Sequence, residues 1–320
     1  SEILYGFFYI TNPKLILKMK WSKFFNFYGL IFAALISLNY LFMSLLKGIP
    51  GNVVALIRVS FIVILMALFA TFWRKWKVIP KKELLLIMIA GVLNFGFYTY
   101  AFAEGIQRTS ATQASIIFNV SPIFSMVFSV IFKLERWSWS AFLGAAVAII
   151  GVGIASFGGV QHGSGSIYGD LLVLVAAILY SFSSALVADI NKKYHPTMFT
   201  SVLSFFGLLI LIPISFVDVQ QIHWANLGEV NYLMLVFSGA LGGAAVFGVY
   251  YKCIAQVGAS SASAYSFFSI PLTALLSFIF LHQGIHLLQV VGLVIVFAGA
   301  GWCIYKRTQK NESISHRACH

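Results

Sequence analysis

The stretch SATQASIIFNVSPIFSMVFSVIF, residues 110–132, carries no charged side chain and is long enough to cross a bilayer as a helix. Hydrophobic residues make up 60% of the 320 residues and charged ones only 9%, which excludes a water-facing globular surface. Other predominantly apolar runs lie near 27–46, 54–72, 84–103, 138–156, 168–188, 198–217, 231–251, 259–281 and 287–304. The sequence therefore predicts an all-α polytopic membrane protein with ten transmembrane helices.

The basic residues predict the orientation of these spans. The chain has 21 Lys and Arg against 9 Asp and Glu, a net charge of +12. With residues 1–26 on the cytoplasmic side, eighteen of the 21 fall in cytoplasmic segments, and only Lys47 and Arg108 fall in external loops. Lys and Arg accumulate on the cytoplasmic side of membrane proteins. We therefore expect both the N-terminal segment and the tail at 305–320 in the cytoplasm, with the bilayer and not nucleic acid as the partner of the basic residues.

The N-terminal region shows no cleavable signal peptide, because no small-residue cleavage site precedes the first apolar run. Met19 is a candidate natural start, in which case residues 1–18 are an upstream extension. The expected location is a bacterial inner membrane.

The two halves of the chain resemble each other. The stretch GAAVAIIG at 144–151 has a counterpart, GLVIVFAG at 292–299, at an offset of 148 residues. Small-residue stretches at 109–115 and 258–263 each precede a proline in the following span. Because each copy would contain an odd number of spans, the second copy enters the membrane from the opposite side, as in many secondary transporters. This predicts two inverted five-helix repeats, 27–156 and 168–304.

Several of these motifs together resemble a known family. Arg58 in the second span, the small-residue stretches before the prolines, and the Glu-x8-Gly-x6-Gly pattern of Glu135, Gly144 and Gly151 resemble the EamA-type branch of the drug/metabolite transporter superfamily. The likeness covers about residues 27–305. It implies a secondary transporter whose spans one, three, four, six, eight and nine surround a central cavity. The second repeat departs from the pattern, since Gln283 stands where Glu is usual.

Two prolines are expected to bend their helices at equivalent places. Pro122 lies in the fourth span and Pro271 in the ninth, and inside a helix each would remove a backbone hydrogen bond. An ordinary kink is the alternative. Their matching placement favours paired bends beside a substrate path.

Polar and aromatic side chains mark the expected cavity. The fourth span carries a polar stripe at helical spacing, and tyrosines recur at matching depth in the first and sixth spans. Polar side chains between membrane helices also serve as interhelical contacts, and tyrosines also gather at membrane interfaces, so both alternatives remain open. The candidate cavity residues are Asn39, Tyr40, Tyr98, Thr112, Ser115, Asn119, Tyr180, Tyr251, Tyr265 and Ser269.

Ionisable residues within spans are candidates for function because burying them without a partner is costly. Three are singled out: Arg58, Glu104 and Lys252. Glu104 is expected to pair either with Arg58, as a clasp or external gate, or with Arg108 one helical turn later. Lys252 is expected either to reach the headgroups at the inner end of the eighth span or to guard the inner mouth.

Signals for other chemistry are weak. His282 and His286 have a metal-like spacing but flank a predicted loop, and the three cysteines form no disulfide framework, so neither a metal nor a cofactor is expected. No phosphate-binding glycine loop or nucleophile motif occurs, which argues against an enzyme and against an ATP-driven pump.

The sequence thus predicts a secondary transporter that exports a small organic metabolite, such as an amino acid, by alternating access. No carboxylate is expected at mid-membrane, which favours a neutral or zwitterionic solute over a cation. The alternatives are an exchanger of phosphorylated or nucleotide-linked sugars and, from another class, a membrane enzyme or receptor. Proton coupling and a homodimer are left open.

Overall fold

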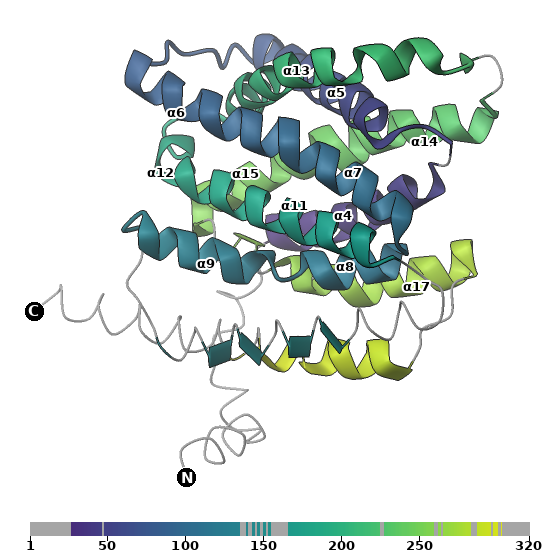
Figure 1. Cartoon of the computed structure of the whole chain (residues 1–320). Helices are drawn as coiled ribbons and strands as arrows, with labels where there is room; N and C mark the ends of the chain where they lie inside the picture. The colour runs from purple at the N-terminus through teal and green to yellow at the C-terminus, as the bar shows by residue number, and fades with distance from the viewer. Residues whose placement is uncertain are drawn as a thin grey trace, which may run out of the picture.

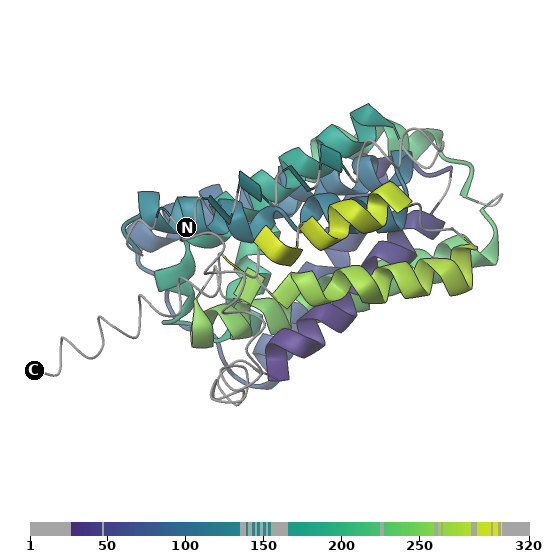
Figure 2. The same ribbon diagram turned by 90° about the horizontal axis from the view of Figure 1, so that it is seen from below.

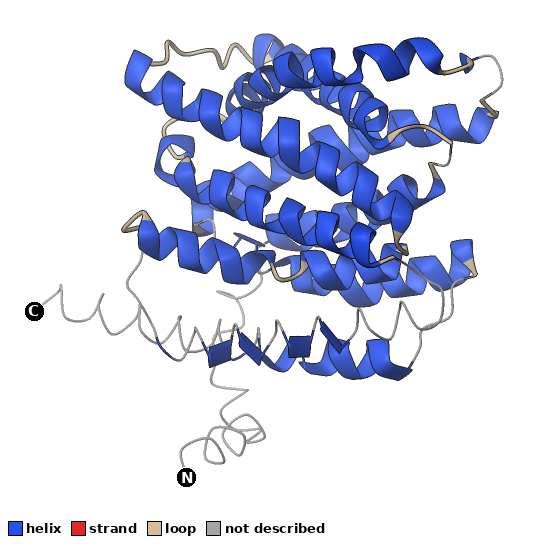
Figure 3. Ribbon diagram, in the orientation of Figure 1, coloured by secondary structure: helices blue, strands red, loops and turns tan. Residues whose placement is uncertain are grey.

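The chain folds into helices wherever a computed structural model describes it, and no strand occurs among those residues (Figure 3). The described residues are 27–46, 48–134, 139, 143–144, 146–147, 150–151, 153–154, 166–224, 227–258, 262–263, 265–282, 287–295, 297–299 and 302. Within them, seven helices are long and apolar enough to cross a membrane, and shorter apolar helices follow at Tyr265–Leu281 and Leu287–Gly299. A multi-pass helical membrane protein is therefore confirmed. The predicted span at 138–156 lies largely outside the described residues, so the ten-helix count stays a prediction.

Of the first four candidate spans, the first two are continuous α-helices, the third contains a π-helical segment and the fourth is divided into two helices. They comprise α4 (Phe27–Leu45), α5 (Gly51–Phe72), α6 (Lys81–Gly91) with η1 (Val92–Tyr98) and α7 (Thr99–Arg108), and α8 (Ala111–Phe118) with α9 (Ser121–Ile131). The later part comprises α11 (Ile167–Leu186), α12 (Ala188–Asn191), α13 (Pro196–Gln221), α14 (Glu229–Gly239) with η3 (Ala240–Ala245) and α15 (Val246–Val257), and η4 (Tyr265–Phe268) with α17 (Ser269–Leu281). The predicted third and eighth spans correspond to the helices Lys81–Arg108 and Glu229–Val257. Both helices are longer than their apolar runs, because they continue into polar turns at both ends.

The two ends of the bundle differ in charge. The left end in Figure 1 holds the loop after α5, the start of α6, the end of α9, α12 and the end of α15. Its described basic residues are Arg74, Lys75, Lys77, Lys81, Lys82, Lys133, Lys192, Lys193 and Lys252, against the acidic Glu83 and Asp189. The opposite end holds the end of α7, the start of α11, the end of α13 and the start of α14. Its described charged residues are Arg108 against Glu104, Asp170, Asp218 and Glu229. One end is thus strongly basic and the other acidic.

Two π-helical segments occur 148 residues apart, the same offset that relates the two halves of the sequence. The π-helical segment η1 starts at Val92 and η3 starts at Ala240, 148 residues later, and each is preceded by an 11-residue helix. The two spans that contain these segments run in opposite directions between the ends of the bundle. The third span starts at the basic end, where Glu83 bonds to Lys193, whereas the eighth ends there, where Lys252 lies over Tyr28.

The helices of the two halves are interleaved (Figures 1 and 2). α4, from the first half, packs against α15 and α17 of the second, and α11, from the second half, packs against α7 and α9 of the first. α5 and α13 pack along each other and each contacts a π-helical segment of the other half. Neither half therefore encloses a core alone.

Two glycines at equivalent places in the two halves allow close contacts between helices, of α6 with α13 and of α14 with α5. A Cβ on Gly91 would overlap the backbone carbonyl of Leu203 in α13, and a Cβ on Gly239 would overlap the side chain of Phe61 in α5. The two glycines are again 148 residues apart. Close backbone approach through small residues is common between membrane helices.

The two prolines lie in the first turns of helices. The α-helix is interrupted at residues 119–120, and Pro122 is the second residue of α9. Pro271 is the third residue of α17, directly after the short helix η4. A proline in the first turn of a helix loses no hydrogen bond, because that N–H has no partner within the helix. The fourth span is therefore broken by ending one helix and starting another.

Candidate functional site

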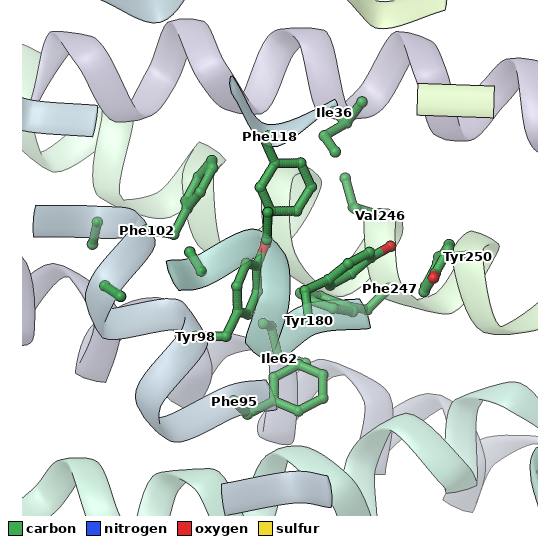
Figure 4. Packing of buried hydrophobic residues seen from close by; sticks show 14 of the residues in the cluster. Ile36, Ile62, Phe95, Tyr98, Phe102, Phe118, Tyr180, Val246, Phe247 and Tyr250 are labelled. Carbon is green, nitrogen blue, oxygen red and sulfur yellow. The ribbon is translucent and has the colours of Figure 1, made fainter. Parts of the chain in front are cut away.

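Aromatic rings from both halves meet in the middle of the bundle (Figure 4). We call the following residues the central aromatic cluster: Tyr40, Phe95, Tyr98, Phe102, Phe118, Tyr180, Phe247, Tyr250 and Tyr251. Tyr98 lies at its centre, with ring centroids 5.4 Å from Tyr180, 5.9 Å from Phe118 and 5.8 Å from Phe102. Every member is at most 3% exposed. Rings at these separations stabilise each other beyond the area they bury.

Four of the predicted cavity residues belong to this cluster. Tyr40 comes from α4, Tyr98 from η1, Tyr180 from α11 and Tyr251 from α15. Tyr180 stacks on Tyr250 with centroids 5.0 Å apart, which extends the cluster into α15. The structure thus brings together residues that the sequence places in spans one, three, six and eight.

Polar groups with unused hydrogen-bonding capacity surround these rings. The Asn94 side chain donates to the Tyr251 hydroxyl at 2.8 Å, but its own Oδ1 accepts no hydrogen bond from the described residues. The same holds for Asn39 Oδ1 and for the Tyr40 hydroxyl, and all three residues are at most 1% exposed. A buried polar atom without a partner costs about 1–3 kcal/mol, so such atoms concentrated at one place indicate a role beyond packing.

Arg58 is the only buried basic side chain among the described residues and is 1% exposed. Its Nη2 donates to the Gly242 carbonyl of η3 at 2.6 Å, and its guanidinium lies 5.9 Å from the centre of the Phe102 ring. A Cβ on Gly242 would overlap the side-chain oxygen of Asn39, so a larger residue there would displace the Asn39 side chain. Arg58 therefore lies beside the central aromatic cluster and joins α5 of the first half to η3 of the second.

The other two predicted charged residues lie at the ends of the bundle. Glu104 forms an ion pair with Arg108 and accepts a hydrogen bond from the backbone N–H of Gly51 at 3.1 Å. The expected alternative, a pair between Glu104 and Arg58, is not formed, because the carboxylate bonds to the nearer arginine on its own helix. Lys252 is exposed, with its Nζ 4.2 Å from the centre of the Tyr28 ring.

The polar stripe of the fourth span is used for helix contacts. Ser115 donates to the Thr112 carbonyl at 2.7 Å, and Asn119 donates to the Ser115 carbonyl at 2.6 Å. Asn119 also accepts a hydrogen bond from Ser266 at 2.8 Å, which connects the breaks of the fourth and ninth spans. These bonds hold the interrupted helices and do not reach the aromatic rings.

The two predicted residues of the ninth span do not belong to the cluster. The ring of Tyr265 packs against Gly29 in the first turn of α4. The Ser269 hydroxyl donates to the Ser266 carbonyl at 2.5 Å, and the Ser269 carbonyl accepts from Ser37 at 3.2 Å. Both residues thus connect the broken ninth span to the first.

Some polar residues of the interior were missed by the sequence analysis. Asn94 lies in the π-helical segment of an apolar span, and its pairing with Tyr251 across 157 residues leaves no local sequence signal. Asp170 is a fourth ionisable residue within a predicted span and is 8% exposed. It accepts hydrogen bonds from Thr109 at 2.9 Å and from Gln113 at 3.4 Å. Its place in the first turn of a predicted helix was a readable signal.

The described residues contain no group of three or more His, Cys, Asp or Glu that could hold a metal ion. Of the two histidines considered, His282 is described and His286 lies outside the described residues.

Comparisons with known proteins agree on one family. The sequence profile of the EamA-like transporter family matches residues 7–157 and 167–305. The WAT1-related protein At4g01450 of Arabidopsis thaliana is 25% identical over 291 residues, which cover 82% of this chain and 80% of the relative. The uncharacterized transporter YdfC of Bacillus subtilis is 25% identical over 267 residues, covering 83% and 86%.

Two further matches extend the likeness. An uncharacterized transporter of Archaeoglobus fulgidus is 27% identical over 237 residues, covering 73% of this chain and 80% of the relative. A solved crystal structure of a protein superposes with a TM-score of 0.63 at 12% identity, over 88% of this chain and 96% of the other, which shows a shared fold.

Proposed function

The chain belongs to the EamA-like transporter family, and from this premise we propose that it is a secondary transporter of a small organic metabolite such as an amino acid. The family resemblance inferred from the sequence is thereby confirmed, and the relatives with a stated activity are described as transporters. The observation that carries the proposal is the central aromatic cluster with its unsatisfied polar groups, which both halves build inside a membrane bundle. Solute sites of transporters lie where two repeats meet.

Alternating access would use the interleaved packing of the halves. The π-helical segments recur at an offset of 148 residues, and the helix interruptions of the fourth and ninth spans both precede a helix that begins with a serine, Ser121 or Ser269, at the same offset. Of these features, η1 supplies Phe95 and Tyr98 to the centre, and η3 supplies the Gly242 carbonyl to Arg58. Rocking of the two halves about this centre, with the fourth and ninth spans closing opposite mouths, gives a solute access to one side at a time. The opposite directions of the third and eighth spans support an inverted arrangement.

The charge of the two ends supports an orientation with the basic end in the cytoplasm. Both termini are then cytoplasmic. In a bacterial inner membrane, the proposed direction of net transport is outward.

The phosphorylated-sugar alternative receives less support. A phosphate dianion calls for several basic groups at its site, whereas Arg58 alone among the described basic residues is buried. Lys252 is exposed at the basic end, and its ammonium group lies over the ring of Tyr28, which is not a member of the central aromatic cluster.

Counterflow in proteoliposomes tests the function. Vesicles preloaded with pools of amino acids, sugars or nucleotides are supplied with the same labelled pools, with and without a pH gradient. We expect saturable uptake of an amino acid pool by the unmodified protein and its loss in Tyr180→Ala, which removes a ring from the centre. Tyr168→Ala is the matched control, because Tyr168 is 57% exposed. Absence of saturable uptake from every pool contradicts the proposal.

A further inference from the structure

Arg58 has more hydrogen-bond donors than partners. A guanidinium carries five N–H groups, and in this side chain only Nη2 donates, to the Gly242 carbonyl. Nε and Nη1, which together carry three N–H groups, donate to no acceptor in the described part of the chain. None of the carboxylates in that part of the chain forms an ion pair with Arg58. A charge that is 1% exposed therefore has no counter-ion among the residues that the structure describes.

Such a charge is unusual on energetic grounds. Moving a guanidinium from water into a protein interior costs several kcal/mol unless an anion and hydrogen-bond acceptors replace the water. In a membrane-spanning segment the cost is the same or larger, and residues of this kind mark solute or ion pathways. The Gly242 carbonyl and the face of the Phe102 ring offset part of the cost. They do not neutralise the charge.

The surroundings of Arg58 suit one kind of ligand. The Tyr40 ring and the Arg58 guanidinium contact the same Phe102 ring, at 5.6 and 5.9 Å from its centre, and the Tyr40 hydroxyl has no hydrogen-bond partner among the described residues. Tyr40 and Arg58 thus pack around one ring, and both carry donors that no described residue uses: the Tyr40 hydroxyl and three N–H groups of Arg58. The rings of Phe102 and Phe118 contact Tyr40 with centroids 5.6 and 6.4 Å away and present apolar surface. Cationic donors next to aromatic rings fit an anionic head group attached to an apolar body.

We propose that Arg58, assisted by the Tyr40 hydroxyl, binds the carboxylate of the transported solute, so that the solutes are small organic carboxylates with an apolar part placed against the central aromatic cluster. This inference rests on the proposed function. The single buried cation favours a monoanionic carboxylate, which two N–H···O bonds satisfy. A zwitterionic amino acid meets the same requirement, with its ammonium group near the faces of the tyrosine rings.

Matched pairs of acids and amides test the inference by binding alone. The detergent-solubilised full chain is titrated with L-phenylalanine and L-phenylalaninamide, L-leucine and L-leucinamide, benzoate and benzamide, and phenyl phosphate, and its melting temperature is recorded. At least one acid should stabilise the unmodified protein with a half-saturating concentration about 10- to 100-fold below that of its amide, as expected for charge-assisted hydrogen bonds. This arm needs no variant, so it does not depend on whether a variant folds.

Variants then assign the preference to Arg58. Arg58→Gln should remove the difference between acid and amide, and Arg58→Lys should keep a part of it. Tyr40→Phe, which preserves the ring, should weaken acid binding but leave amide binding unchanged. Arg74→Gln is the matched control, since Arg74 is exposed at the basic end and should keep the full preference. Melting without ligand and gel filtration identify any variant that fails to fold.

Several outcomes overturn the inference. They are equal binding of acids and amides, an acid preference that survives in folded Arg58→Gln, stabilisation by phenyl phosphate but by no carboxylate, and no stabilisation by any acid. Counterflow separates these from failure of the proposed function. Saturable flux without a carboxylate preference rejects the inference and leaves the function standing, whereas Arg58-dependent acid binding without flux of any pool rejects the function.

Discussion

The hydroxyl of Ser181 in α11 lies 2.7 Å from the backbone carbonyl of Ser121, the first residue of α9, and shares its one proton between this carbonyl and that of Ala177 on its own helix, also at 2.7 Å. The other half has a matching contact: the Ser37 hydroxyl in α4, which bonds to the Ala33 carbonyl of its own helix at 2.7 Å, also lies 3.2 Å from the carbonyl of Ser269, the first residue of α17. The two accepting serines are 148 residues apart. Each half thus holds the helix interruption of the other half in place.

Removing the Ser181 hydroxyl should loosen one interruption. We expect Ser181→Ala to lower the free energy of unfolding by about 1 kcal/mol, because the buried Ser121 carbonyl loses its side-chain donor. The measurement is the melting temperature in detergent together with the counterflow rate. Ser183→Ala is the matched control: Ser183 is equally buried on the same helix but bonds only to the Tyr180 carbonyl within it. An equal decrease in melting temperature in both variants would show that the contact between the halves contributes no more to stability than a hydrogen bond within one helix.

Adding one methyl group at Gly91 should separate α6 from α13. The Cβ of Gly91→Ala would overlap the Leu203 carbonyl, which belongs to the backbone of a packed helix and cannot rotate away. Overpacking of this kind costs about 1–3 kcal/mol. Thermal melting measures it, with Gly153→Ala as the control, because a Cβ at Gly153 meets nothing within 4 Å. Gly91→Ala that melts like the unmodified protein would argue against the close approach of these helices.

The sequence was sufficient for the features that depend on local pattern. Apolar runs predicted the spans, and Tyr40 and Tyr180, which are equivalent by sequence spacing, both lie in the central aromatic cluster. The family was readable from Arg58 and the glycine pattern, and the profile match confirms it.

Features that depend on tertiary contacts were not readable. The one hydrogen bond of the Arg58 side chain goes to the Gly242 carbonyl, 184 residues away in a π-helical segment. No periodicity in the sequence indicates this acceptor or shows which N–H groups of Arg58 remain without one. Tyr265 shares a polar pattern with the fourth span but contacts Gly29, because the ninth span packs on the start of α4. The spacing of residues within one helix predicts on which face of the helix a side chain lies. Which other helix packs against that face depends on the arrangement of the whole bundle.

The basic end should contribute a pH dependence through His195, which precedes α13. Partial burial, reinforced by the positive charges of Lys75 and Lys252, lowers the pKa of His195 from its usual value of 6.5. The unfolded chain then binds the proton more readily than the folded one, so this contribution to stability is present above pH 6.5 and is lost as the pH falls below it.

His195→Asn should therefore flatten the fall in melting temperature between pH 7 and pH 5. The Nδ1 of His195 lies 2.8 Å from the Thr197 hydroxyl, and the Asn amide keeps a polar group there without titrating. His223→Asn, at an exposed histidine after α13, is the control and should retain the slope of the unmodified protein. The same slope in both variants would remove His195 as its source.

Lys252 provides the test between the two solute classes. It is exposed at the basic end, and its contact with the Tyr28 ring is worth about 0.5–1 kcal/mol at such a site. Arg58, not Lys252, is the cation beside the central aromatic cluster, so Lys252→Gln should leave the initial rate of amino acid counterflow within about twofold of the unmodified protein. Lys192→Gln, at another exposed lysine of the same end, is the comparison. A phosphorylated solute would need Lys252 as a second cation at its site. Loss of hexose phosphate counterflow in folded Lys252→Gln, with Lys192→Gln unaffected, would therefore assign the protein to the exchangers. The substitution removes only the charge of Lys252, so only transport of a solute that contacts this side chain should depend on it.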